Sequence, residues 1–138
     1  MADLALSPVA VALYGVLNVG SLTTLATGGV YDDIPQSVTF PFVLVEVQER
    51  DVRGFGLGGL PECTVRLRVY STYQGWKEAQ SILSQAITLL KDVALTVNGY
   101  RMCGHVFYDE SVPIPDSEIN GVKCKELVAN FRVYVEEA

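Results

Sequence analysis

The sequence holds a single histidine, His105, which stands two residues after Cys103. A cysteine beside a histidine can form a nucleophile together with its base. Both residues fall in a segment with a strand-like pattern, where residues two apart share a face but need not touch. We therefore interpret them as ordinary strand residues. No serine nucleophile elbow and no His-Glu-x-x-His helix occurs, so the sequence predicts no catalytic residue and no enzyme.

The cysteines and paired aspartates are the next candidates for chemistry. Asp32 and Asp33 stand just before Pro35, a pattern typical of a turn in which the carboxylates cap backbone amides. No Cys-x-x-Cys pair occurs among the three widely spaced cysteines, Cys63, Cys103 and Cys124. This spacing predicts neither a zinc site nor a redox pair, and it fits a reducing intracellular environment. We expect no metal and no cofactor.

Acidic residues also gather in the proline-containing segment 109–121, which we expect to be a long polar loop. A calcium site would need more closely spaced ligands than this segment offers, and a glycine at the bend, which the segment lacks. We interpret the segment as a solvated loop or one ordered by assembly, with its acidic residues being Asp109, Glu110, Asp116 and Glu118.

A glycine-rich loop over 50–61 matches Gly-x-Gly-x-x-Gly at Gly54, Gly56 and Gly59. A dinucleotide site needs a helix after such a loop, whereas Pro61 and a strand pattern follow here. The sequence therefore predicts the flexible tip of a hairpin. This tip carries apolar residues that could become ordered against a partner, namely Phe55, Leu57 and Leu60.

Composition narrows the class of protein. The chain has 138 residues, which indicates a single domain over 1–138. Charged residues make up 19% of the chain, below the ~25% of an average soluble domain. The net charge of −6 disfavours tight binding to nucleic acid. The longest apolar run, 8–17, is shorter than the ~20 residues that a membrane helix needs. We expect part of the surface to contact another protein.

The apolar periodicity places the elements along the chain. Helical spacing predicts helices over 8–17, opened by Ser7 and Pro8, and over 75–91. Alternation predicts strands over 41–50 and 62–71, paired as a hairpin, and a strand over 122–136. Asn98-Gly99 predicts a second hairpin between 94–97 and 100–108. The expected fold is α+β, a mainly antiparallel sheet with two helices on one face and two long loops.

The second face of this sheet, away from the helices, has an unusual composition. It is too aromatic for a purely solvated face and too charged for a core. A solvated amphipathic face remains an alternative, but Tyr and Arg are the types that interfaces favour, and we favour a contact face. Its residues are Arg66, Arg68, Tyr70, Asn130, Arg132 and Tyr134, with some of Arg101, His105 and Phe107.

The order of these segments resembles the tail-terminator, or tail-completion, proteins of long-tailed bacteriophages. The resemblance covers most of the chain and depends on order and spacing, since each motif is degenerate. Its segments are the helix over 8–17, Gly-Gly-Val-Tyr-Asp-Asp-Ile-Pro at 28–35, Phe-Pro-Phe-Val at 40–43, Arg-Leu-Arg-Val-Tyr-Ser at 66–71 leading into Glu-Ala-Gln at 78–80, and Phe-Arg-Val-Tyr-Val-Glu at 131–136.

The resemblance implies a structural virion protein of the tail or neck, assembled in the host cytoplasm. Such a subunit would form a homohexameric ring on the tail tube protein, end tail polymerisation and join a head-completion or connector protein. DNA would pass through the acidic channel without specific binding. Alternatives are a head-completion protein on the head side of the joint and a small ligand-binding domain. The sequence leaves open whether the particle is a phage, a gene-transfer particle or another tail-like machine.

Overall fold

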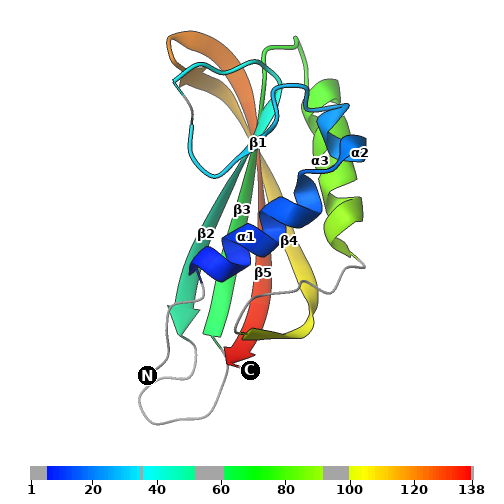
Figure 1. Cartoon of the computed structure of the whole chain (residues 1–138). Helices are drawn as coiled ribbons and strands as arrows, with labels where there is room; N and C mark the ends of the chain where they lie inside the picture. The colour runs from blue at the N-terminus through cyan, green and yellow to red at the C-terminus, as the bar shows by residue number, and fades with distance from the viewer. Residues whose placement is uncertain (1–5, 35, 52–60, 92–99, 138) are drawn as a thin grey trace.

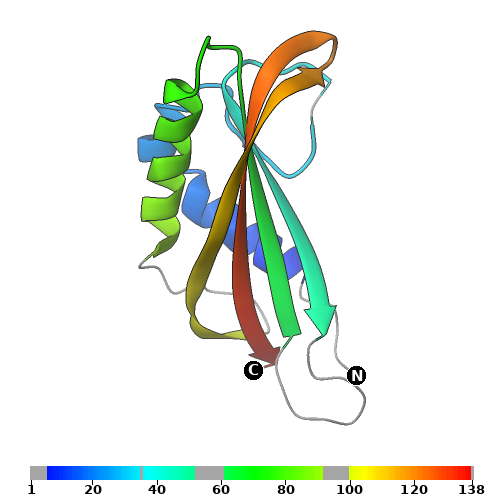
Figure 2. The ribbon, with the colours of Figure 1, turned by 180° about the vertical axis from the view of Figure 1, so that it is seen from behind.

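The computed structural model describes residues 6–34, 36–51, 61–91 and 100–137. Within them, five strands form one sheet in the order β1–β2–β3–β5–β4, and the helices lie on one of its faces (Figure 1). The view from behind shows the other face without a helix over it (Figure 2). The expected α+β class is therefore confirmed.

The helix layer is made of α1 (Leu6–Leu17), the short α2 (Gly20–Thr23) and α3 (Lys77–Lys91). One face of α1 buries Val9, Leu13 and Leu17 completely, whereas Val11 on the opposite face is 72% exposed. The longer α3 buries a stripe at helical spacing, which confirms the predicted helix: Ala79, Ile82, Leu83, Ala86 and Leu90. α1 packs mainly on β2 and α3, while α3 packs over β3, β5 and β4.

The central strands alternate as the sequence predicts. β2 (Phe42–Asp51) pairs antiparallel with β3 (Pro61–Ser71), and β3 pairs with β5 (Val122–Glu137). The row Val45, Leu67 and Ala129 faces the helices and is buried. Because side chains alternate along a strand, the neighbouring rows face away from the helices. The predicted loop between β2 and β3 lies outside the described residues, over 52–60.

The prediction of a polar loop over 109–121 is wrong. β4 (Tyr100–Ile119) runs through this segment and pairs with β5 up to a tight turn at Asn120 and Gly121. These two residues have φ values of 50° and 81°, which suit a type I′ hairpin turn. β4 is the edge strand, where a missing backbone N–H is tolerated, so Pro113 and Pro115 do not end it.

The other hairpin prediction, around Asn98-Gly99, lies outside the described residues, and only its second strand is seen as the start of β4. A two-residue strand that the sequence did not predict, β1 (Val30–Tyr31), pairs parallel with β2. Gly28 allows this approach, because a Cβ there would lie 1.7 Å from the backbone oxygen of Thr39. None of the described helices is long and apolar enough to span a membrane.

The core is divided between the two faces of the sheet. The main cluster lies between the sheet and the helices. A second, smaller cluster lies on the face without helices, where Tyr31, Val38 and Phe40 pack against its buried members, namely Phe42, Leu44, Tyr70, Ile119 and Cys124. One end of this face is therefore apolar and buried, which leaves the rest of it as the exposed sheet surface.

Candidate assembly surface

The predicted contact residues fall into three groups in the structure. Phe55, Leu57 and Leu60 lie outside the described residues. Tyr70 is 4% exposed and stacks on Phe42 in the second core cluster, with ring centroids 4.9 Å apart. The remaining four lie on the sheet face without helices: Arg66, Arg68, Arg132 and Tyr134. We call this surface the polar face. It also includes Asn130 and the acidic side chains that pair with these residues, namely Glu46, Asp109, Glu110 and Glu126.

At the centre of the polar face, Arg68 on β3 bridges carboxylates on both neighbouring strands. Its Nε pairs with Glu46 on β2 and its Nη1 with Glu126 on β5. The Glu126 side chain is only 8% exposed, and its second oxygen accepts a hydrogen bond of 2.9 Å from the Ser117 hydroxyl on β4. Four strands are thus joined by one buried carboxylate and one guanidinium.

Burial and the charges of this network shift the pKa values of Arg68 and of two neighbouring side chains. Burial lowers the pKa of Arg68, but the hydrogen bonds to Glu46 and Glu126 outweigh it and the net shift is upward. Burial and then the nearby Glu126 charge raise the pKa of Tyr70 to about 12. Burial, followed by the Glu126 charge, also raises the pKa of the Cys124 thiol. Tyr70 and Cys124 are therefore neutral near pH 7, and Cys124 is not activated as a nucleophile.

Arg132 organises the side of the polar face nearer β4. Its Nε donates to both carboxylate oxygens of Asp109, at 2.9 and 3.0 Å, and its Nη1 donates to the Tyr134 hydroxyl at 2.9 Å. The guanidinium also lies 5.5 Å from the centre of the Phe107 ring. The hydrogen bond that Arg132 donates to Asp109 is the main cause of the raised pKa of Arg132. Arg132 is thus held in place by three residues, Asp109, Tyr134 and Phe107.

The third arginine of the polar face, Arg66, is also held by a neighbouring side chain. Arg66 donates through Nε to the Asn130 oxygen at 3.2 Å, and the Asn130 amide donates to Glu110 at 3.4 Å. Each arginine of the polar face therefore has a fixed partner within the chain. Because their orientations are set before binding, the side chains would lose little conformational freedom in an interface.

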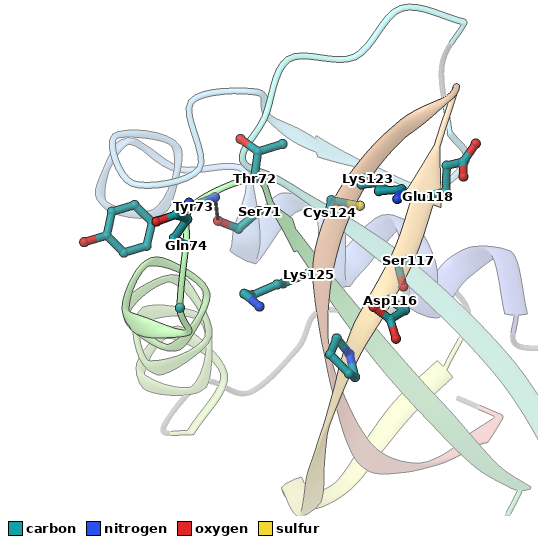
Figure 3. Close-up of a pocket in the computed structure, with 12 residues that line it drawn as sticks. Ser71, Thr72, Tyr73, Gln74, Asp116, Ser117, Glu118, Lys123, Cys124 and Lys125 are labelled. Carbon is teal, nitrogen blue, oxygen red and sulfur yellow. Dashed lines mark hydrogen bonds between the residues drawn. The ribbon is translucent and has the colours of Figure 1, made fainter.

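A groove opens at one end of the helix side. It encloses about 520 Å³ between the β3–α3 loop and the β4–β5 hairpin. Figure 3 shows Ser71 to Gln74 on one wall and the hairpin residues on the other. The Ser71 hydroxyl donates to Glu78 at 2.6 Å and accepts from the Tyr73 amide at 3.1 Å, which fixes the loop. Lys125 lies over the Trp76 ring, 5.1 Å from its centre.

The chemistry available in this groove is limited. Its charged residues are of both signs, namely Asp116, Glu118, Lys123 and Lys125. Among the residues the structure describes, no group of three or more His, Cys, Asp or Glu is arranged to hold a metal ion.

Asp33 accepts a hydrogen bond of 2.9 Å from the Ile34 amide, as expected for a turn residue. The side chains of Cys103 and His105 lie outside the described ones.

The family model described as tail completion protein gp17 matches residues 11–136, almost the whole chain. The chain belongs to this family. It is therefore a structural protein of the virion, associated with the tail. The resemblance seen in the sequence is confirmed. Comparison with curated proteins gives no match.

Solved structures share the fold of this tail completion protein. A chain from the virion of a native gene transfer agent particle has a TM-score of 0.75 at 18% identity, covering 91% of this chain and 92% of that chain. The gp17 protein of bacteriophage SPP1 has a TM-score of 0.55 at 15% identity, covering 94% and 89%. At 18% and 15% identity, the similarity shows that these chains share a fold.

Sequence reasoning missed the acidic half of the polar face of this tail completion protein. The arginines were recognised by their alternation, but Glu126 and Asp109 were not assigned as their partners. A signal existed for Glu126, because it is a charged residue on the face of β5 that also carries Asn130 and Arg132. Asp109 carried no such signal, because its segment was expected to be a loop.

Proposed function

We propose that this tail completion protein is the subunit of a homohexameric ring that caps the tail tube, ends its polymerisation and joins it to the head connector. The observation that carries the proposal is the family match over 11–136. The fold shared over 91% of the chain with a chain of a gene transfer agent virion supports it. A cap that is not a tube subunit can stop growth by occupying the tube end without offering the surface to which the next tube subunit binds.

The surface of the described residues suits such a joint. The polar face offers preordered hydrogen-bonding groups around Arg68 and Arg132, and the hairpin of β4 and β5 extends beyond the end of β3 at Ser71. A joint needs separate surfaces for neighbouring copies, for the tube and for the connector. We assign the polar face, together with Phe55, Leu57 and Leu60 of the glycine-rich segment 52–60, to assembly contacts.

The charge of the chain bears on DNA passage. With a net charge of −6 per subunit, a ring would be strongly acidic. Acidic side chains facing the channel would repel the phosphate backbone, so DNA would slide without being held. Assembly would take place in the host cytoplasm, where tails and filled heads meet.

Deletion of the gene tests the proposal. Lysates without the protein should contain filled heads and unjoined tails, some of them overlong, and purified protein added back should restore joined particles. Normal infectious particles in the deletion lysate would refute the role. The head-side role is separated by binding assays with purified tail tubes and connectors. Binding to tail tubes is expected, whereas binding to connectors without any binding to tubes would place the protein on the head side of the joint.

A further inference from the structure

One border of the sheet is open along most of β2. β1 pairs with β2 only at Val43 and Leu44, and beyond Leu44 no strand among the described residues lies beside β2 on that side. Figure 1 and Figure 2 both show the lower part of β2 at the border of the sheet. Val47 is half-buried there and Gln48 is exposed. The stretch 45–51 pairs with β3 without a register shift, so it forms a regular edge.

The backbone of this stretch offers hydrogen-bonding groups to a further strand. The Val43 N–H donates to the Gly29 oxygen, on the side of β1, at 3.0 Å. Peptide groups alternate in direction along a strand, so those of Val47, Glu49 and Asp51 point to this same side, beyond the last pair with β1. An open and regular row of peptide groups is a template for pairing with another strand.

The opposite border of the sheet is regular only at the start of β4. Residues 100–103 pair with β5 without interruption, whereas register shifts interrupt β4 further along. Pro113 and Pro115 also lie in that later part, and proline has no N–H to donate to a further strand. The part of this border that is suited to pairing is therefore 100–103.

We infer that the open stretch of β2 in one copy pairs with residues 100–103 of β4 in the next copy. This inference rests on the proposed ring. A closed ring needs a heterologous contact between two different surfaces of the subunit. β2 and β4 supply two such surfaces, because their open stretches lie on opposite sides of the sheet (Figure 1). Addition of a strand to an exposed sheet edge is a common way to join two chains.

Strand direction and height favour a second copy as the occupant of the β2 edge. Each neighbouring pair from β2 through β3 and β5 to β4 is antiparallel, so β4 runs opposite to β2. Subunits of a ring share one orientation, so β4 of the next copy would also run antiparallel to β2. One row of paired residues connects the two open stretches: Arg50, Glu62, Tyr134 and Cys103. A second copy therefore supplies a strand that matches the β2 edge in direction and in height.

Hydrogen exchange of backbone amides tests this pairing, measured in the monomer and in the ring assembled in solution or on tail tubes. The amides of Val47 and Glu49 should exchange at least about tenfold more slowly in the ring, as should the outward-facing amides within 100–103. The amides of Glu46 and Gln48 are the matched control, because they face β3 and are already bonded in the monomer. Unchanged exchange at Val47 and Glu49 in an assembled ring would overturn the inference.

A proline substitution provides a second test. Val47→Pro removes an N–H that faces the open border and none that bonds to β3, and proline is tolerated at such edge positions. The variant should keep its circular dichroism spectrum and lose ring assembly. Val47→Ala is the control, because it also shortens the side chain but keeps the N–H, and it should still assemble. Normal assembly of a folded Val47→Pro chain would contradict the pairing, and if that variant does not fold, the exchange measurement decides.

The outcomes separate this inference from the proposed ring. If a ring assembles without slower exchange at Val47 and Glu49, the strand pairing is wrong and the ring stands. If exchange slows on β2 but not over 100–103, a different strand occupies the edge, such as β2 of a second copy or a strand of the tube protein, and the inference is also wrong. If the chain does not associate with itself in solution or on tubes, the proposed ring fails as well.

Discussion

Arg68 on β3 and Glu126 on β5 form an ion pair in which the carboxylate is almost completely buried. Glu126 also accepts the Ser117 hydroxyl from β4, so its charge links the centre of the sheet to the β4–β5 hairpin. A buried carboxylate is stable only when its partners are in place. The ion pair at the centre of the polar face therefore stabilises the folded sheet, in addition to forming part of its surface.

Glu126→Gln should lower the free energy of unfolding by about 2 kcal/mol, because it leaves Arg68 without its buried counter-charge. Glu46→Gln is the matched control, since it removes the other partner of Arg68. Glu46 is 41% exposed and water can replace it, so the loss should stay under about 1 kcal/mol. Urea unfolding of both variants measures the difference. Equal losses would contradict the role given to burial.

Stability should fall as the pH rises through the range set by Tyr70. Its pKa is raised from 10.0 to about 12, so between these values the folded chain retains a proton that the unfolded chain has lost. Stability from this group is therefore complete below about pH 10 and decreases toward pH 12. Tyr70→Phe should flatten this part of the curve in urea unfolding between pH 9 and 12. An unchanged slope would show that other groups cause it.

Leu83→Asp should prevent folding. Leu83 is buried under the sheet on α3, and an unpaired carboxylate there costs at least about 3 kcal/mol. The control is Thr88→Asp, on the exposed side of the same helix, which should fold normally. Circular dichroism and solubility of the two variants give the answer. A folded Leu83→Asp chain would mean that α3 does not cover the core.

Gly28→Ala should destabilise the chain by about 2 kcal/mol, because the new methyl group would collide with the backbone of Thr39. Gly15→Ala is the matched substitution in open space within α1. There the lower backbone entropy of alanine should stabilise the helix by about 0.5 to 1 kcal/mol. Opposite signs in thermal unfolding would support the close approach at β1, and equal effects would count against it.

Replacing Phe55 and Leu57 with serine should leave the monomer folded and weaken assembly. Both residues stand in the glycine-rich segment 52–60 between β2 and β3, where we propose a contact with a partner. Circular dichroism should match the unmodified chain, while complementation of a deletion lysate should yield fewer joined particles. Full joining activity in this double variant would show that segment 52–60 is not part of the assembly surface.

The strands and helices of the core could be predicted because burial imposes a period on the sequence. Val65, Leu67 and Val69 alternate with polar residues, and only a strand with one buried face requires that pattern. The α3 stripe is equally direct. The segment 109–121 could not be assigned in the same way, because an edge strand with bulges carries little periodicity and tolerates proline. Asn120-Gly121 was the available signal, the same dipeptide that was used at Asn98-Gly99.

The sequence by itself determined the fold class, the family and the two faces of the sheet, because these depend on apolar spacing and on the order of motifs along the chain. Only the tertiary structure decided which charges meet. Arg68 pairs with Glu46 and Glu126, residues 22 and 58 positions away, and Tyr70 is buried beneath the loop before β2. Strand order and register bring these residues together, and both are properties of the whole sheet.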